Sequence, residues 1–149
     1  MRDNRMSADR RSSATIQLSR NGVIHEATIA WRRDDRLWLV VITSSAFEPV
    51  EARAFDAFDA FEALVRVRDE LEPQGWRVGV AGALANVWPS GMAGDQGAGL
   101  RAYRMSVDRV EGLVDTFEPV DPMTVTTVAQ QRAEIERLHG ELARRAREH

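Results

Sequence analysis

The segment from Trp88 to Gly99 concentrates the residues that could bind a ligand or a partner. Its four glycines stand at positions 91, 94, 97 and 99. Glycine permits positive φ and a close approach of the backbone, so consecutive N–H groups here could form a binding site for an anion such as phosphate. The spacing matches neither the P-loop pattern nor the dinucleotide-binding pattern, and the residues that follow predict a strand where both motifs require a helix. Nucleotide binding is therefore the weaker interpretation.

The same segment and the strand after it carry side chains that favour contact with another protein. Aromatic, methionine and arginine residues are enriched at the energetic centres of protein interfaces. We expect the partner-binding residues to be Trp88, Met92, Asp95, Arg101 and Tyr103. The alternative is a compact surface loop in which the glycines serve the chain path and Trp88 and Met92 fold back over the core.

Other combinations of reactive side chains do not form a coherent set. His25, Ser90 and Asp95 could be written as a catalytic triad, but nothing in their spacing supports one. Glu136 and His139 stand three residues apart, a spacing that carboxylate-bridged metal sites use on two helices at once, and the motif occurs once here. The sequence predicts no catalytic residue, no cofactor and no metal site, and it favours a protein that is not an enzyme.

Two missing residue types exclude whole classes of chemistry. The 149 residues include no lysine and no cysteine. Without lysine there is no P-loop lysine and no Schiff base, and without cysteine there is no thiolate nucleophile, disulfide or cysteine-ligated zinc. The net charge of −3 also disfavours nucleic acid as a partner.

The elements that would position these residues begin with three predicted strands. Residues 15–20 alternate between apolar and polar types, and Asn21-Gly22 is a strong signal for a tight hairpin turn. A second strand is expected over residues 23–32. Residues 37–43 form a continuous β-branched, apolar run, which predicts a strand in the centre of the sheet with both faces covered.

A helix and further strands are expected after this meander. Apolar residues at three- and four-residue spacing predict an amphipathic helix from Asp56, as its N-cap, to Leu71. Residues 76–81 and 100–105 predict two strands that extend the same sheet, and residues 113–117 could form a short one. Near the end of the chain, Thr127 and Gln130 form a capping-box signal.

The predicted fold class is α+β. We expect a mainly antiparallel sheet of five to six strands, one central packing helix, and a C-terminal amphipathic helix over about residues 126–146. Residues 1–13 are expected to be a disordered lead, and residues 14–149 a single domain. No apolar run resembles a secretion signal or a membrane span, so we expect a cytoplasmic protein.

One set of residues resembles a known group of proteins. They are Asn86-Val-Trp-Pro-Ser-Gly-Met92, then Asp95, Gly97, Gly99 and Tyr103, and downstream Leu113-Val-Asp-Thr-Phe117 and the helix start from Thr127 to Gln131. Together they are similar to a family of small uncharacterised bacterial proteins. The resemblance covers about residues 76–140 and implies no activity, cofactor or site residue. Proteins of this size and style often act as interaction or immunity-type proteins, which is an analogy rather than an argument from residues.

These observations predict a non-enzymatic protein-interaction module, of the adaptor or immunity type, that uses the Gly-rich segment 86–103. The alternative is a small-molecule or nucleotide-binding domain, with or without enzyme activity, that uses the same segment with Asp95 and Arg101. A homodimer through the C-terminal helix is compatible with both.

Overall fold

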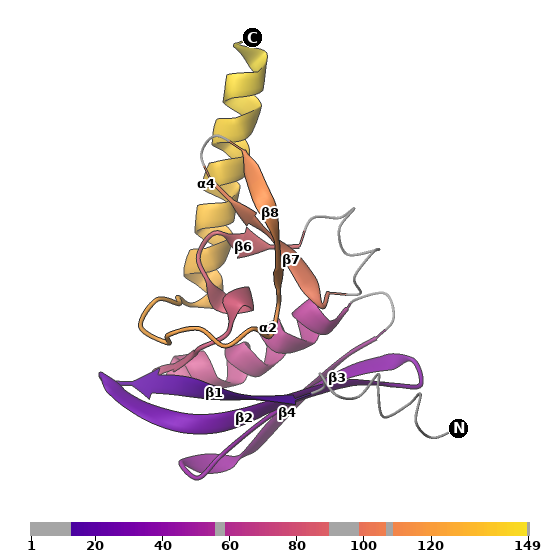
Figure 1. The fold of residues 1–149 in the computed structure, drawn as a ribbon, viewed down its shortest axis with the longest axis vertical. Helices are drawn as coiled ribbons and strands as arrows, with labels where there is room; N and C mark the ends of the chain where they lie inside the picture. Colours follow the sequence, from indigo (N-terminus) through magenta and orange to yellow (C-terminus); the bar gives the residue numbers. More distant parts are fainter. Residues whose placement is uncertain (1–12, 56–58, 90–98, 107–108, 149) are drawn as a thin grey trace.

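The computed structural model describes residues 13–55, 59–89, 99–106 and 109–148. These residues form an α+β fold with a five-stranded antiparallel sheet, a smaller three-stranded antiparallel sheet and two α-helices. Helix α2 lies between the two sheets, and helix α4 runs beside the small sheet and ends beyond it (Figure 1). The predicted fold class is confirmed, although the strands form two sheets instead of one.

The five-stranded sheet holds the N-terminal half of the chain. Its strands are β1 (Ser13–Arg20), β2 (Val23–Asp34), β3 (Leu37–Ser44), β4 (Phe47–Phe55) and β5 (Trp76–Val78), in the order β4-β3-β2-β1-β5. The predicted turn is confirmed, since Asn21 and Gly22 have φ of 54° and 80°. Strand β3 is an interior strand, as predicted, but it lies one place from the centre of the sheet. Strand β4, which was not predicted, forms the edge beside it.

Helix α2 (Ala60–Leu71) begins later than the sequence indicates. Its N-cap is Asp59, whose carboxylate accepts a hydrogen bond from the N–H of Glu62 at 3.1 Å. The predicted N-cap, Asp56, lies outside the described residues. The helix ends at Leu71, as predicted. The short 3₁₀ helix η1 (Glu72–Gln74) follows, and Gly75 then takes a left-handed conformation with φ of 96°.

The small sheet is formed by β6 (Val87–Trp88), β7 (Arg101–Met105) and β8 (Val110–Asp115), in the order β6-β7-β8. The strand predicted over 100–105 therefore belongs to a second sheet, and the prediction that it extends the first was wrong. The strand predicted over 113–117 lies earlier in the chain. Phe117 follows it as a buried core residue, and the 3₁₀ helix η2 (Ala81–Ala83) packs nearby.

Helix α4 (Val128–Arg147) confirms the predicted C-terminal helix and its capping box. The Thr127 hydroxyl accepts a hydrogen bond from the N–H of Gln130 at 3.1 Å, and the Gln130 side chain accepts one from the backbone N–H of Thr127. Its apolar stripe docks on the small sheet, where Ile135 and Leu138 are buried with Met105. Among the described residues, no helix combines the length and apolar character needed to span a membrane.

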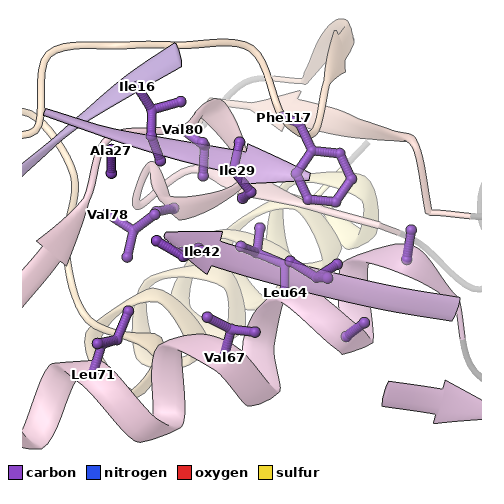
Figure 2. Close-up of a cluster of buried hydrophobic side chains, with 14 of the residues drawn as sticks. Ile16, Ala27, Ile29, Ile42, Leu64, Val67, Leu71, Val78, Val80 and Phe117 are labelled. Atoms are coloured by element: carbon purple, nitrogen blue, oxygen red, sulfur yellow. The ribbon is translucent and has the colours of Figure 1, made fainter. Parts of the chain in front are cut away.

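The main core lies between the inner face of the five-stranded sheet and helix α2. Figure 2 shows this cluster, in which Ile16, Ile29 and Ile42 come from the sheet, Leu64 and Val67 from α2, and Phe117 from the segment after β8. Burying each such side chain stabilises the fold by about 1.5–3 kcal/mol. Because Phe117 comes shortly after β8, this core also holds the end of the small sheet in place.

Candidate functional site

The structure places three of the five predicted partner-binding residues on the small sheet. Trp88 on β6 and Tyr103 on β7 are cross-strand neighbours, and Arg101 lies exposed at the start of β7. Met92 and Asp95 lie outside the described residues, as does Ser90 of the triad that the sequence disfavoured. Residues distant in sequence are thus brought together on adjacent strands.

Trp88 is half-buried and serves as a packing residue. Its ring meets Phe61 of α2 edge-on at 5.2 Å between centroids. The guanidinium of Arg132 on α4 lies over the same indole at 5.1 Å, within cation–π range. Trp88 therefore joins both helices to the small sheet, which agrees with the interpretation in which it folds back over the core.

Tyr103 is also half-buried, and it packs against the cluster of Met105, Ile135 and Leu138. On its other side it pairs with Leu113 of β8, whose side chain is 46% exposed. Trp88, Tyr103 and Leu113 therefore form one row across the small sheet, which runs from a packed end to an exposed edge.

Gly99 fixes the end of the Gly-rich segment against helix α2. Its φ is +81°, and a Cβ atom there would lie 2.5 Å from the N of Phe61 and 2.6 Å from the carboxylate of Asp59. Its carbonyl accepts a hydrogen bond from the buried Thr116 hydroxyl at 2.6 Å. Glycine is required here by close packing on the N-cap of α2, which agrees with the sequence argument for close backbone approach.

Strand β8 forms an uncovered edge of the small sheet. The N–H of Thr116 donates to the carbonyl of Leu100 at 2.9 Å, so the ladder alternation turns the main chain of Val114 towards β7 and that of Leu113 outwards. Val110 and Leu113 are both 46% exposed. Among the described residues, no side chain donates or accepts a hydrogen bond at the main chain of Val110–Asp115. This edge is available for pairing.

The corresponding edge of the large sheet is protected. On β4, the outward-facing carbonyl of Arg53 accepts a hydrogen bond from Nη1 of Arg66, which reaches over the edge from α2 at 2.8 Å. Pro49, which has no N–H to offer, lies where the β3–β4 register shifts. Proteins use such devices to prevent edge-to-edge pairing. The two edges therefore differ in their readiness to accept another strand.

A cleft of about 600 Å³ opens between the two sheets. Its apolar part includes Trp31, Leu100 and Phe117, and its charged rim includes Arg101, Asp115 and Glu118. The Trp31 and Phe117 rings are stacked, with centroids 4.4 Å apart and planes inclined by 11°. Arg101 and Asp115 form a long, exposed ion pair at 4.0 Å.

A buried polar cluster around Arg68 was missed by the sequence analysis. The Arg68 guanidinium donates to the Glu72 carboxylate at 2.7 Å and to the Thr126 carbonyl at 2.8 Å. The amide nitrogen of Gln131 donates to the carbonyl groups of Gly82, Leu84 and Val87 at 2.7, 2.9 and 2.8 Å. Burial lowers the pKa of Arg68, and the neighbouring Glu72 opposes that shift.

This cluster is structural, because its polar groups are bonded to one another and to main-chain carbonyls. The other Glu72 oxygen accepts the N–H of Val128, the first residue of α4, at 2.8 Å. A helix pattern marks Arg68 only as one charged residue between apolar ones. Glu72, four residues on, reads in the sequence as an ordinary i,i+4 ion pair. The partners that show Arg68 to be buried, Thr126 and Gln131, are more than fifty residues away, so no local signal identifies the cluster.

The described residues also offer little that could bind a metal ion. Glu136 and His139 are exposed on α4. In the part of the chain that the structure describes, no three His, Asp or Glu side chains gather closely enough to hold a metal ion.

Neither a scan against protein-family models nor a search of curated proteins found a match. The resemblance over about residues 76–140 stays a prediction.

Proposed function

We propose that this chain is a non-enzymatic protein-interaction module that binds an extended segment of a partner protein along the free edge of β8. The observation that carries the proposal is the contrast between the two sheet edges. The β4 edge is closed by Arg66 and Pro49, whereas β8 offers unpaired main-chain groups beside exposed Val110 and Leu113. In strand addition, main-chain hydrogen bonds supply affinity and neighbouring side chains supply specificity.

The predicted contact residues support this location. Arg101 and Tyr103 lie on β7, the strand next to β8, and Trp88 anchors the far side of the same sheet. A segment paired with β8 would extend the row of Trp88, Tyr103 and Leu113. Contacts through Met92 and Asp95 are part of the proposal and lie outside the described residues.

A homodimer through α4 has less support as the main interaction. The apolar stripe of α4 is buried against the small sheet as far as Leu138. The following residues carry acid–arginine pairs within the helix, such as Arg145 with Glu141 at 3.2 Å. A helix face of this kind is typical of solvent exposure.

The test is capture of partners by the tagged protein in its native cells, with variants at one position. Leu113→Pro removes an outward-facing N–H without removing a β7–β8 hydrogen bond, and Leu113→Lys places a charge on the edge. Both variants should lose, by at least about tenfold, a partner that the wild type retains.

The matched control is Thr43→Lys, at an exposed position on the large sheet. It should bind as the wild type does. Each variant is first checked for an unchanged melting temperature and a dispersed amide spectrum. Equal capture by wild type and folded Leu113→Pro would contradict strand addition.

A further inference from the structure

The cleft between the two sheets has a chemistry of its own. Its volume, about 600 Å³, lies within the range of small-molecule sites, roughly 300–1,000 Å³. One wall is the stacked pair of Trp31 and Phe117, and Leu100 adds further apolar surface. Such a wall favours a flat or compact apolar group.

The charges at the rim have an acidic excess. Two carboxylates, Asp115 and Glu118, face one guanidinium, that of Arg101. Arg101 is already paired with Asp115 at 4.0 Å. Glu118 is exposed, and among the described residues its carboxylate has no ion pair. A ligand with a positive charge would balance this rim.

The aromatic wall of the cleft also favours a positively charged ligand. One face of the Trp31 indole is stacked on Phe117, and the indole remains half-buried at the cleft. The face of an indole attracts a cation more strongly than that of any other side chain. An acidic rim beside an indole is a combination that favours cations and disfavours anions.

The main chain around Glu118 is held firmly. Its N–H donates to the carbonyl of Asp115 at 3.1 Å, and its carbonyl accepts from the N–H of Ala81 at 2.8 Å. Pro119, the next residue, bridges to Val80 beside the large sheet. The main chain that carries the Glu118 side chain is therefore fixed at the rim of the cleft, as a binding site requires.

From these observations we infer that the cleft is a binding site for a small amphipathic cation, in which an apolar or aromatic body lies against Trp31 and a protonated nitrogen lies between Asp115 and Glu118. The site is separate from strand addition at β8, which uses the main chain at Leu113. No covalent step is involved.

The experiment uses the full chain labelled with ¹⁵N and three probes of similar size. The probes are 2-phenylethylamine, which is cationic at neutral pH, 2-phenylethanol, which is neutral, and 3-phenylpropionate, which is anionic. The chain has four tryptophans and hence four indole N–H signals, and Trp31→Phe assigns the one from Trp31. The amine should shift the Trp31 indole and the amides of residues 115–118, with weaker effects from the alcohol and none from the acid.

Variants test whether the Glu118 carboxylate binds the charged end of the amine. Glu118→Gln should weaken binding of the amine about fivefold, as expected for one unit charge at about 4 Å in water, and leave binding of the alcohol unchanged. Glu111→Gln is the matched control, since it removes a carboxylate on β8 that does not line the cleft. It should leave the affinity within about twofold.

Three results would overturn the inference. They are equal shifts from all three probes, amine-induced shifts that spare Trp31, and an equal loss of affinity in Glu118→Gln and Glu111→Gln. None of these results bears on the β8 edge, because Leu113→Pro is tested by partner capture alone.

Discussion

The guanidinium of Arg68 donates a hydrogen bond to Oε1 of Gln131 at 2.6 Å, and both side chains are fully buried. This contact joins the last turn of α2 to the first turn of α4. The amide nitrogen of Gln131 in turn donates hydrogen bonds to carbonyl groups of the segment that leads into β6. The small sheet and α4 are therefore both connected to α2 through Arg68 and Gln131. The proposed binding surfaces depend on this connection for their position.

Replacing Arg68 should destabilise the protein severely. Arg68→Met removes the donor to one oxygen of the buried Glu72 carboxylate and to the carbonyl of Thr126. Breaking a buried charge pair from one side costs about 3–5 kcal/mol of unfolding free energy. Urea denaturation measures the loss, and the control Arg137→Met, at an exposed ion pair with Glu134 on α4, should cost only a small part of that free energy. Similar losses in both variants would show that burial of Arg68 is unimportant.

Two glycine substitutions should change the stability of the protein in opposite directions. Gly99→Ala forces a Cβ to within 2.5 Å of the Phe61 backbone at a φ of +81°, so it should destabilise the protein by about 2 kcal/mol or more. Gly140→Ala, in α4 with nothing within 4 Å, should stabilise it by about 0.5–1 kcal/mol. Thermal unfolding of both variants tests the pair. A neutral Gly99→Ala would contradict the close approach to α2.

Substitutions on the small sheet should separate packing from surface roles. Trp88→Ala removes contacts with Phe61 and Arg132, and we expect a loss of about 2 kcal/mol or more. Arg132→Ala should cost about 0.5–1 kcal/mol, the value of one exposed cation–π contact. Arg101→Ala, at an exposed ion pair, should stay within about 0.5 kcal/mol. If Trp88→Ala leaves the unfolding midpoint unchanged, Trp88 is a surface residue after all.

Opening the protected edge of the large sheet should increase self-association. The double variant Pro49→Thr, Arg66→Ala restores an N–H to the irregular stretch of β4 and uncovers the carbonyl of Arg53. Two copies of β4 paired antiparallel about Ala52 would place Glu51 opposite Arg53 in both directions, which is favourable. Sedimentation at matched concentrations should show a larger weight-average mass than for the wild type. An unchanged mass would mean that these residues do not guard the edge.

Local patterns explain which parts of the fold could be predicted. Asn21-Gly22 and the Thr127 capping box are short-range signals, and both turned out as the sequence indicates. Strand β4 was missed because its register shifts near Pro49, which interrupts the alternation. The start of α2 was placed too early because two aspartates, Asp56 and Asp59, compete as caps and the sequence does not rank them.

The site depended on long-range contacts that a local pattern does not contain. The grouping of Trp88, Arg101 and Tyr103 could be anticipated from one Gly-rich segment and the strand after it. The free edge of β8 could not, because it follows from the separation of the small sheet from the large one. The cleft likewise needs Trp31 to meet Phe117, which lies far along the chain.

The end of α4 should respond to acid through Glu141. Hydrogen bonding from Arg144 lowers the pKa of Glu141, and Arg145 adds a second hydrogen bond at 3.2 Å. A carboxyl whose folded pKa is lowered contributes stability that is fully present above the ordinary glutamate pKa and is lost as the pH falls through the lowered value. Amide exchange of residues 141–147 should therefore speed up over that acidic range, and the carboxyl ¹³C signal of Glu141 should titrate below the ordinary value. Glu141→Gln should remove this dependence, whereas an unaltered pH profile in that variant would place the acid-sensitive group elsewhere.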